Sequence, residues 1–270
     1  MLDSSSVGGI ILALLGILAG LIIEGGRIDQ VLQPTAAMIV FGGTFGAVLL
    51  QYPLATVLEA LRRLARVFFQ PKNSGRQTLK QIVEFANKAR RSGIVSLDAD
   101  LESIQDPCLR QALMLAVDGT EPAELRAIME LQLENQSESE EKIPAVFESA
   151  GGFSPTIGII GAVIGLIQVM QHLDHISEVG RGIAVAFVAT IYGVAAANIL
   201  FLPAAGKLKI RVREDQRLRE MAVEGVISIL EGMNPRMIEL KLQSFLGASA
   251  KKQKKDKKSD KKTAAQESTA

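Results

Sequence analysis

The stretch GIAVAFVATIYGVAAANILFLPAAG, residues 182–206, contains no Asp, Glu, Lys or Arg. A window of this length can cross the hydrocarbon core of a bilayer, which takes about 20 helical residues. A helix is the expected form, because every backbone N–H and C=O in lipid must be hydrogen bonded within the protein. Three further windows are equally free of charge: residues 4–23, 30–58 and 149–173.

The four windows predict an all-α integral membrane protein with four transmembrane helices and a mostly helical cytoplasmic domain. A cleaved signal peptide is the alternative for the first window. No Lys or Arg precedes that window and no small-x-small cleavage pattern follows it, which disfavours the alternative. We place the spans near residues 7–23, 34–52, 153–172 and 183–203.

The basic residues set the expected orientation. The first and second spans form one hairpin and the third and fourth another, each with a short link. Of the 30 Lys and Arg residues, only Arg27 and Arg181 lie in these two links. Clusters of Arg and Lys instead follow the second and fourth spans. The positive-inside rule then predicts a multi-pass membrane protein with residues 53–151 and both termini in the cytoplasm.

The charged segments read as helical. Apolar residues recur at helical spacing, and no stretch alternates at the period of a strand. We expect helices over 54–69, 78–91, 108–117 and 122–134, with the fourth span continuing as a helix to about 231. We expect five parts along the chain. Residues 1–52 form a first transmembrane hairpin, residues 53–151 a cytoplasmic helical domain, and residues 152–205 a second transmembrane hairpin. Residues 206–246 form a cytoplasmic helix extension, and residues 247–270 form a disordered Lys-rich tail.

Composition excludes several classes of protein. Hydrophobic residues make up 48% of the chain but aromatic residues only 4%, with no Trp, a balance typical of membrane helices. One cysteine and two histidines exclude a disulfide scaffold and leave little for a metal site, so we expect none. The net charge of +1 argues against nucleic-acid binding. No nucleophile, base and ligand set can be placed, so we expect no enzyme and no cofactor.

The charge-free windows also constrain how the chain could handle ions. A protein that moves ions normally keeps an ionisable group at membrane depth, and these windows hold no carboxylate or lysine. The titrating carboxylate must therefore come from a partner. Thr190 is the best candidate for a hydroxyl that faces such a partner. The alternative is that Thr190 donates to a carbonyl one turn earlier in its own helix.

Two prolines and several glycines stand out in the spans. Pro155 and Pro203 lie at the ends of the third and fourth spans, where they cap or kink the helices. Alternatively they are hinges that couple the membrane to the cytoplasmic helices. Glycines four residues apart allow close helix packing. These pairs are Gly16 and Gly20, Gly42 and Gly46, and Gly161 and Gly165.

The segment KARRSGIVSLDAD, residues 88–100, separates cations from anions. Such charges usually form a solvated face. Docking of another charged protein is the alternative, since exposed complementary charge steers association. The tail carries eight Lys and three acidic residues, so it either binds anionic lipid or keeps the chain soluble during synthesis.

Four stretches resemble the MotA/PomA family of flagellar stator subunits. The resemblance covers about residues 5–246, and the last two stretches are long and specific. The four are GGTFGAVLLQYP (42–53), ARRSGIVSLDAD (89–100), SPTIGIIGAVIGLIQVM (154–170) and GRGIAVAFVATIYGVAAANILFLPAAGKLK (180–209).

This resemblance implies a protein of the bacterial inner membrane that forms a ring of five copies around two copies of a MotB-like subunit. In the family, the MotB-like subunit brings one membrane helix with an aspartate and a domain that grips peptidoglycan. Ion flux past that aspartate drives rotation against the rotor protein FliG. The alternative interpretation within the same superfamily is an energy transducer of the ExbB/TolQ type, although such proteins usually have three spans. A passive membrane scaffold is the rival from another class.

The resemblance also assigns roles to residues. Thr190 matches the pore threonine, and Pro155 and Pro203 match the prolines thought to link protonation to cytoplasmic movement. Arg90 and Asp98 match the pair that engages FliG, with Asp98 where the family more often has Glu.

The ion pathway is expected to include Thr190, Tyr192 and Ala162. Ala162 stands where the sodium-type relatives have Thr, and without that hydroxyl a hard cation loses an oxygen ligand. Protons are therefore favoured as the coupling ion, with sodium as the alternative.

Overall fold

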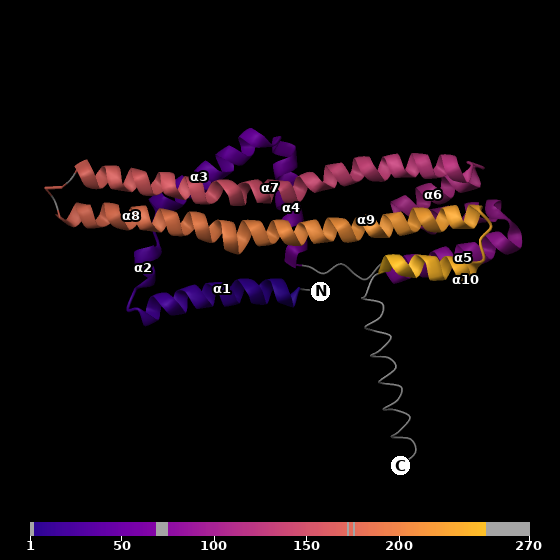
Figure 1. Cartoon of the computed structure of the whole chain (residues 1–270), viewed down its shortest axis with the longest axis horizontal. Helices are drawn as coiled ribbons and strands as arrows, with labels where there is room; N and C mark the ends of the chain where they lie inside the picture. The colour runs from indigo at the N-terminus through magenta and orange to yellow at the C-terminus, as the bar shows by residue number, and fades with distance from the viewer. Residues whose placement is uncertain (1–2, 69–74, 172, 175, 247–270) are drawn as a thin grey trace, which may run out of the picture. The chain divides into compact units, whose positions relative to one another are not determined.

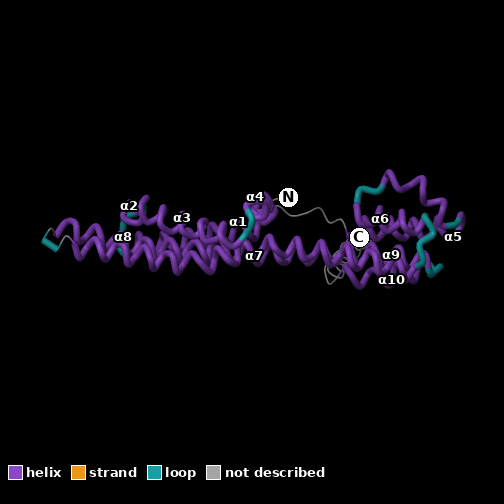
Figure 2. The backbone as a smooth tube through the Cα atoms, turned by 90° about the horizontal axis from the view of Figure 1, so that it is seen from above, coloured by secondary structure: helices purple, strands orange, loops and turns teal. Residues whose placement is uncertain are grey.

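The computed structural model describes residues 3–68, 75–171, 173–174 and 176–246. Every regular element within these ranges is a helix, as Figure 2 shows, which confirms the all-α prediction. The chain forms two compact units. Unit 1 contains the described residues within 1–71 and 138–212, and unit 2 contains those within 72–137 and 213–270. The predicted disordered tail, together with His172 and His175, lies outside the described residues.

Four helical stretches are long and apolar enough to cross a membrane. They agree with the four charge-free windows, so the prediction of four spans is confirmed. The stretches are Ser4–Ile23, Ile28–Gln51, Pro122–Gln171 and Val179–Leu230.

The third span belongs to one continuous helix, α7 (Pro122–Gln171), of 50 residues. The sequence predicted a helix over 122–134 and a separate span from 153. Pro144 and Pro155 both lie inside α7, so neither ends it. A proline removes one backbone donor and crowds the preceding turn, but packing against neighbouring helices compensates for this loss in membrane spans.

The fourth span is helical throughout, with a change of helix type in its middle. α8 (Ile176–Ala195) passes into a π-helical segment, η2 (Ala196–Phe201), and then into α9 (Leu202–Leu230). The expected continuation to about residue 231 is confirmed. The π segment was not predicted.

The other helices of unit 1 differ in how far they are buried. α3 (Pro34–Gln51) packs against α8 through Ala36 and Val40, which are fully buried. α1 (Ser4–Ile23) contacts α2 (Ile28–Val31), α4 (Leu54–Phe68) and η2, yet none of its own residues is buried. The apolar side chains of α1 are thus left facing outward.

Unit 2 is a helical bundle with its own aliphatic core. Polar caps fix its helix starts: Asp106 accepts from the Cys108 and Leu109 amides, and Asn234 accepts from the Arg236 amide. The core includes Ile82, Leu109 and other fully buried residues of each main helix. The unit contains α5 (Gly75–Ser92), η1 (Ile94–Ser103), α6 (Pro107–Val117), the first part of α7, the last part of α9, α10 (Pro235–Leu242) and η3 (Gln243–Leu246).

Candidate functional site

The candidate site lies on the pair formed by α7 and α8, whose backbones touch. Figure 1 shows the two helices running side by side. A Cβ added to Gly193 would lie 2.5 Å from the Ser154 carbonyl oxygen, and one added to Gly165 would lie 2.9 Å from the Ala186 amide nitrogen. Glycine is therefore required along this contact, because any side chain would force the helices apart.

A buried hydrogen bond joins the same two helices. The Ser154 hydroxyl, which is fully buried, donates to the Gly193 carbonyl oxygen at 3.0 Å. The predicted close approach is confirmed for Gly161 and Gly165. Within this one chain, by contrast, an added Cβ at any of the four paired glycines of α1 and α3 would meet no described atom within 4 Å.

Thr190 lies on the open side of α8. Phe187 and Ile191 beside it are 69% and 48% exposed, and Thr190 itself is half-buried. Its hydroxyl donates to the Ala186 carbonyl oxygen at 3.2 Å, one turn earlier in the same helix, as the alternative prediction had it. That bond uses the single donor of the hydroxyl and leaves oxygen lone pairs that can accept. Thr190 can therefore still accept a hydrogen bond from a partner.

Tyr192 lies on a different side of α8 from Thr190. Two residues along a helix correspond to a rotation of about 200°. The Tyr192 hydroxyl donates to the Val31 carbonyl oxygen at 2.6 Å and accepts from the Gln33 amide at 3.3 Å. Its ring packs on the small cluster that joins α3 to α8. In this structure Tyr192 holds the link before α3, and it does not share a face with Thr190.

Ala162 is a half-buried residue of α7 and adds no oxygen to the pair. Its neighbour Gly161 makes the close contact, since an added Cβ there would lie 2.8 Å from Ala189 Cβ. Along residues 154–170 of α7, the polar side chains are Ser154, Thr156 and Gln168. The wall that α7 and α8 form is thus apolar over most of its length.

The two prolines lie within continuous helix, so the suggestion that they cap the spans was wrong. Pro155 follows Ser154 inside α7. Pro203 follows the π segment directly, and the backbone of Leu202 before it is helical. Because Pro203 has no N–H, the regular bond to the carbonyl of Ile199 cannot form. π segments often interrupt α-helices at functional sites.

Side-chain hydrogen bonds compensate for part of the interrupted backbone hydrogen bonding before Pro203. Asn198, within the π segment, donates from its side chain to the Val194 carbonyl oxygen at 2.9 Å. The neighbouring Gly193 carbonyl accepts from Ser154. Two successive carbonyls before the π segment therefore have side-chain partners, which marks a local change in the hydrogen-bond ladder at this point.

Asp3 forms a buried ionic cluster that sequence analysis missed. Its side chain is 3% exposed and lies 2.5 Å from Lys207 Nζ and 3.5 Å from an Arg211 guanidinium nitrogen. Hydrogen bonds from Lys207 and Ser5 hold the pKa of this carboxyl well below its ordinary range. Asp3 therefore stays ionised and is unsuited to carry a proton. No sequence pattern links residues 208 positions apart.

The residues matched to the rotor contact lie in unit 2. Arg90 is in the last turn of α5 and Asp98 is in η1, and both are exposed. Among the described residues, neither side chain forms an ion pair. Lys88 and Asp100 from the same segment do pair, at 2.6 Å. The structure thus separates the segment into one internal ion pair and charges that remain open to solvent.

Three charged side chains also meet within unit 2. Glu224 on α9 lies 3.0 Å from Arg126 on α7 and also pairs with Lys241 on α10. Burial tends to raise the pKa of Glu224, but the hydrogen bonds from Lys241 and Arg126 outweigh it and lower that pKa. This cluster ties three helices of the unit together.

Comparisons with known proteins agree with this arrangement. The model of the MotA/TolQ/ExbB proton channel family matches residues 100–221, and the model of the motility protein A N-terminal region matches residues 7–93. Motility protein A of Bacillus subtilis (strain 168) is 36% identical over 251 residues, which cover 92% of each chain.

Two solved structures are also similar. The flagellar MotAB stator complex from Bacillus subtilis matches with a TM-score of 0.84 and 35% identity, over 93% of this chain and 99% of that one. The C. jejuni MotAB structure matches with a TM-score of 0.85 and 32% identity, over 90% and 95% of the two chains.

Proposed function

Because the chain belongs to the motility protein A family, we propose that it is a flagellar stator subunit that conducts ions together with a MotB-like partner. The observation that carries this proposal is the apolar wall of α7 and α8. Its two windows, 149–173 and 182–206, contain no ionisable Asp, Glu, Lys or Arg. A channel that uses a titrating carboxylate must then receive it from the partner.

The wall would distinguish the two charge states of a partner aspartate. An ionised carboxylate loses a large solvation free energy against an apolar surface, whereas a neutral carboxylic acid tolerates it. The neutral acid also has an O–H that can donate to Thr190, whose oxygen lone pairs are available. Protonation therefore favours contact with the wall near Thr190, and release of the proton disfavours it.

The change in preferred contact between the two charge states would drive each rotational step of the motor. Each proton that crosses the membrane potential provides about 2.3 kcal/mol per 100 mV, which is several times the thermal energy. A ring of five copies around two partner subunits would advance by one position as the preferred contact changes. Pro155 and the π segment before Pro203 are the places where such a change would pass along the helices.

The orientation follows the basic residues. Both termini and unit 2 lie in the cytoplasm, on the side where Lys and Arg follow the second and fourth spans. The ion pair of Asp3 with Lys207 supports this placement, because it sets the start of the first span beside the end of the fourth. Arg90 and Asp98 then face the rotor protein FliG with exposed charges.

The coupling ion is the proton in this proposal. Ala162 offers no oxygen for a sodium ion, which prefers oxygen ligands as a hard cation. An energy transducer of the ExbB/TolQ type is the second candidate. The match of residues 7–93 to the motility protein A N-terminal region favours the motor.

The experiment is motility in a strain that lacks its own stator and expresses this chain with its partner. Swimming should stop with a protonophore and should not depend on sodium concentration. Swimming that requires sodium would contradict the proton assignment, and no swimming with any flagellar partner would contradict the motor. Reversal of Arg90 to Glu, rescued by the opposite change on the rotor, tests the FliG contact.

A further inference from the structure

The helix that follows the second span lies across the direction of the spans. Within unit 1, Figure 1 shows α4 crossing the direction of α7 and α8, and Figure 2, turned by 90°, shows α4 nearly end-on. Only Tyr52 and Pro53 separate α4 from the end of α3. The charge-free window 30–58 also extends past α3 into the start of α4. α4 therefore begins where the second span leaves the hydrocarbon core, and its axis runs along the membrane surface.

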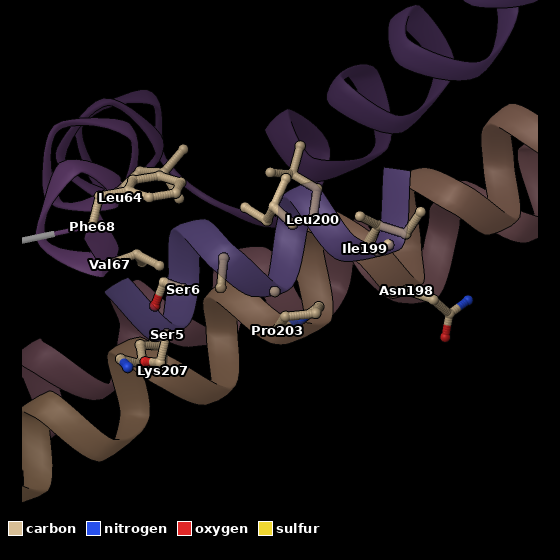
Figure 3. Close-up of a pocket in the computed structure, with 14 residues that line it drawn as sticks. Ser5, Ser6, Leu64, Val67, Phe68, Asn198, Ile199, Leu200, Pro203 and Lys207 are labelled. Atoms are coloured by element: carbon tan, nitrogen blue, oxygen red, sulfur yellow. The ribbon is translucent and has the colours of Figure 1, made fainter. Parts of the chain in front are cut away.

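One face of α4 packs against the rest of unit 1. Val57, Ala60 and Val67 are buried in an apolar cluster with residues of α7, η2 and α9. Leu64, Val67 and Phe68 line a pocket that they share with the start of α1, as Figure 3 shows. These residues recur every three or four positions, so they form a single stripe along the helix. Packing within the chain accounts for this stripe.

A second apolar stripe of α4 is exposed. Leu54, Leu58 and Leu61 are 61%, 46% and 46% exposed. Because each residue turns the helix by about 100°, their spacing of four and three residues places them within about 60° of one another. The exposed side chain of Ala65 extends the same stripe by one turn. A continuous exposed apolar surface of this kind marks contact with another molecule or with the membrane.

Charged residues occupy the third side of α4. Glu59 and Arg63 pair with each other at 2.6 Å. Arg62 follows Leu61 directly, is exposed, and forms no ion pair with any described residue. A helix that carries an exposed apolar stripe bordered by a cation is typical of helices that lie in the interface of a membrane.

The surroundings of the leucine stripe favour lipid over a protein partner. Leu50, at the end of α3, is 92% exposed, and a leucine with this exposure in a membrane span faces hydrocarbon. The exposed apolar surface continues from Leu50 to Leu54 with no charged residue between them. The stripe itself contains no aromatic residue, whereas the cores of protein interfaces are enriched in Tyr, Trp and Phe.

We propose that α4 lies in the cytoplasmic leaflet as an interfacial helix, with Leu54, Leu58 and Leu61 among the acyl chains and Arg62 at the phospholipid phosphates. The long side chain of Arg62 can reach the headgroups while its aliphatic part stays beside the leucines. The choice of leaflet rests on the orientation in the proposed function, whereas the depth of α4 does not. α4 then joins unit 1 to the bilayer surface and fixes the level at which α3 ends.

Tryptophan fluorescence of the full chain in phosphatidylcholine vesicles tests the depth of α4. The chain contains no Trp, so a single introduced Trp reports only its own surroundings. Leu61→Trp should emit at short wavelength and lose most of its fluorescence when the acyl chains carry bromine, and Leu58→Trp should behave in the same way. Glu59→Trp is the matched control, because two residues correspond to a rotation of about 200°. It should be quenched by iodide in solution and little by bromine.

Two outcomes of this measurement would overturn the proposal. Equal quenching by bromine at residues 59 and 61 would mean that the leucine stripe is not the lipid-facing side. Short-wavelength emission at residues 58 and 61 without quenching by bromine would mean that protein, such as a second copy of the chain, covers the stripe. Neither measurement depends on ion flux or motility, so the proposed function can fail while this inference stands.

A second pair of variants tests the headgroup contact of Arg62. In the Leu61→Trp chain, Arg62→Glu places a negative charge beside the phosphates, so quenching by bromine should fall in vesicles that contain phosphatidylglycerol. Arg110→Glu makes the same change of charge at an exposed residue of α6, in unit 2, and should leave the quenching unchanged. Equal quenching in these two variants would contradict the contact between Arg62 and the phosphates.

Discussion

The carboxylate of Asp3 and the ammonium group of Lys207 lie 2.5 Å apart, although they come from opposite ends of the membrane-spanning sequence. Asp3 also caps α1, because its side chain accepts from the Ser5 amide, and its own amide donates to the Phe68 carbonyl oxygen at 2.7 Å. The start of α1 is therefore bound to both α4 and α9. Since no residue of α1 itself is buried, this anchor adds to the contacts that the helix makes with α2, α4 and η2.

Replacement of Asp3 should loosen the first span. Asp3→Asn keeps the cap but removes the charge between Lys207 and Arg211, which leaves two cations close together. We expect a lower melting temperature of the complex and weaker motility. Asp29→Asn is the matched control, because its pair with Arg27 is more than 60% exposed on both sides and exposed pairs contribute little. Equal melting temperatures for the two variants would argue against an anchoring role.

Thr190→Val should abolish swimming while assembly with the partner remains intact. Valine has nearly the same shape but cannot accept a hydrogen bond from a neutral carboxylic acid. Thr190→Ser restores the hydroxyl and should restore part of the motility. Swimming assays and co-purification of the partner measure the two effects.

Thr44→Val is the control for this prediction. Thr44 is fully buried and makes the same kind of bond to its own helix, to the Val40 carbonyl oxygen at 2.6 Å. It lies on α3, away from the open side of α8, so motility should persist. If Thr44→Val stops swimming as completely as Thr190→Val, the role of Thr190 is not specific.

Gly193→Ala should disrupt the contact between α7 and α8. The new Cβ would lie 2.5 Å from the Ser154 carbonyl oxygen, closer than carbon and oxygen can approach. Overpacking of this kind costs about 1–3 kcal/mol. Gly46→Ala meets no described atom and should be neutral or stabilising by up to about 1 kcal/mol. Thermal unfolding in detergent compares the two, and a Gly193→Ala variant as stable as Gly46→Ala would refute the close contact.

Glu224 predicts a pH dependence of stability. Its folded pKa is lower than the ordinary value of 4.5, because the hydrogen bonds from Lys241 and Arg126 outweigh the effect of burial. A group with a lowered pKa stabilises the fold above its unfolded pKa, and this contribution is lost as the pH falls through the folded pKa. Wild type should therefore exceed Glu224→Gln in melting temperature near about pH 7, and the difference should shrink toward about pH 4. A difference that grows on acidification would reverse the sign of this account.

The sequence alone predicted the parts of this fold that depend on the absence of charge. Four windows without Asp, Glu, Lys or Arg located the four spans, because charged residues rarely face lipid. Prediction from the sequence failed where tertiary packing overrides the local tendency of proline to end a helix. A helix over 122–134 and a separate span from 153 were expected, yet α7 runs without a break through Pro144 and Pro155. The π segment depends on the hydrogen bonds around Pro203, and these cannot be read from spacing.

The candidate site was only partly predictable for a similar reason. Thr190 was predicted as a hydroxyl in a charge-free span and Ala162 from the resemblance, and the structure places both on the apolar pair as half-buried residues. Tyr192 was grouped with Thr190 because both are polar in one span, but the helical rotation separates their faces. Asp3 carried no pattern, since its role depends on Lys207 and Arg211 far along the chain.

The central claim is that this chain forms an apolar wall and takes its titrating carboxylate from a partner. Proton flux into vesicles under an applied potential tests it most directly. The purified chain alone should conduct no protons, and the chain with its partner should conduct, unless the partner's membrane aspartate is replaced by Asn. Voltage-driven proton flux through the chain alone would contradict the account.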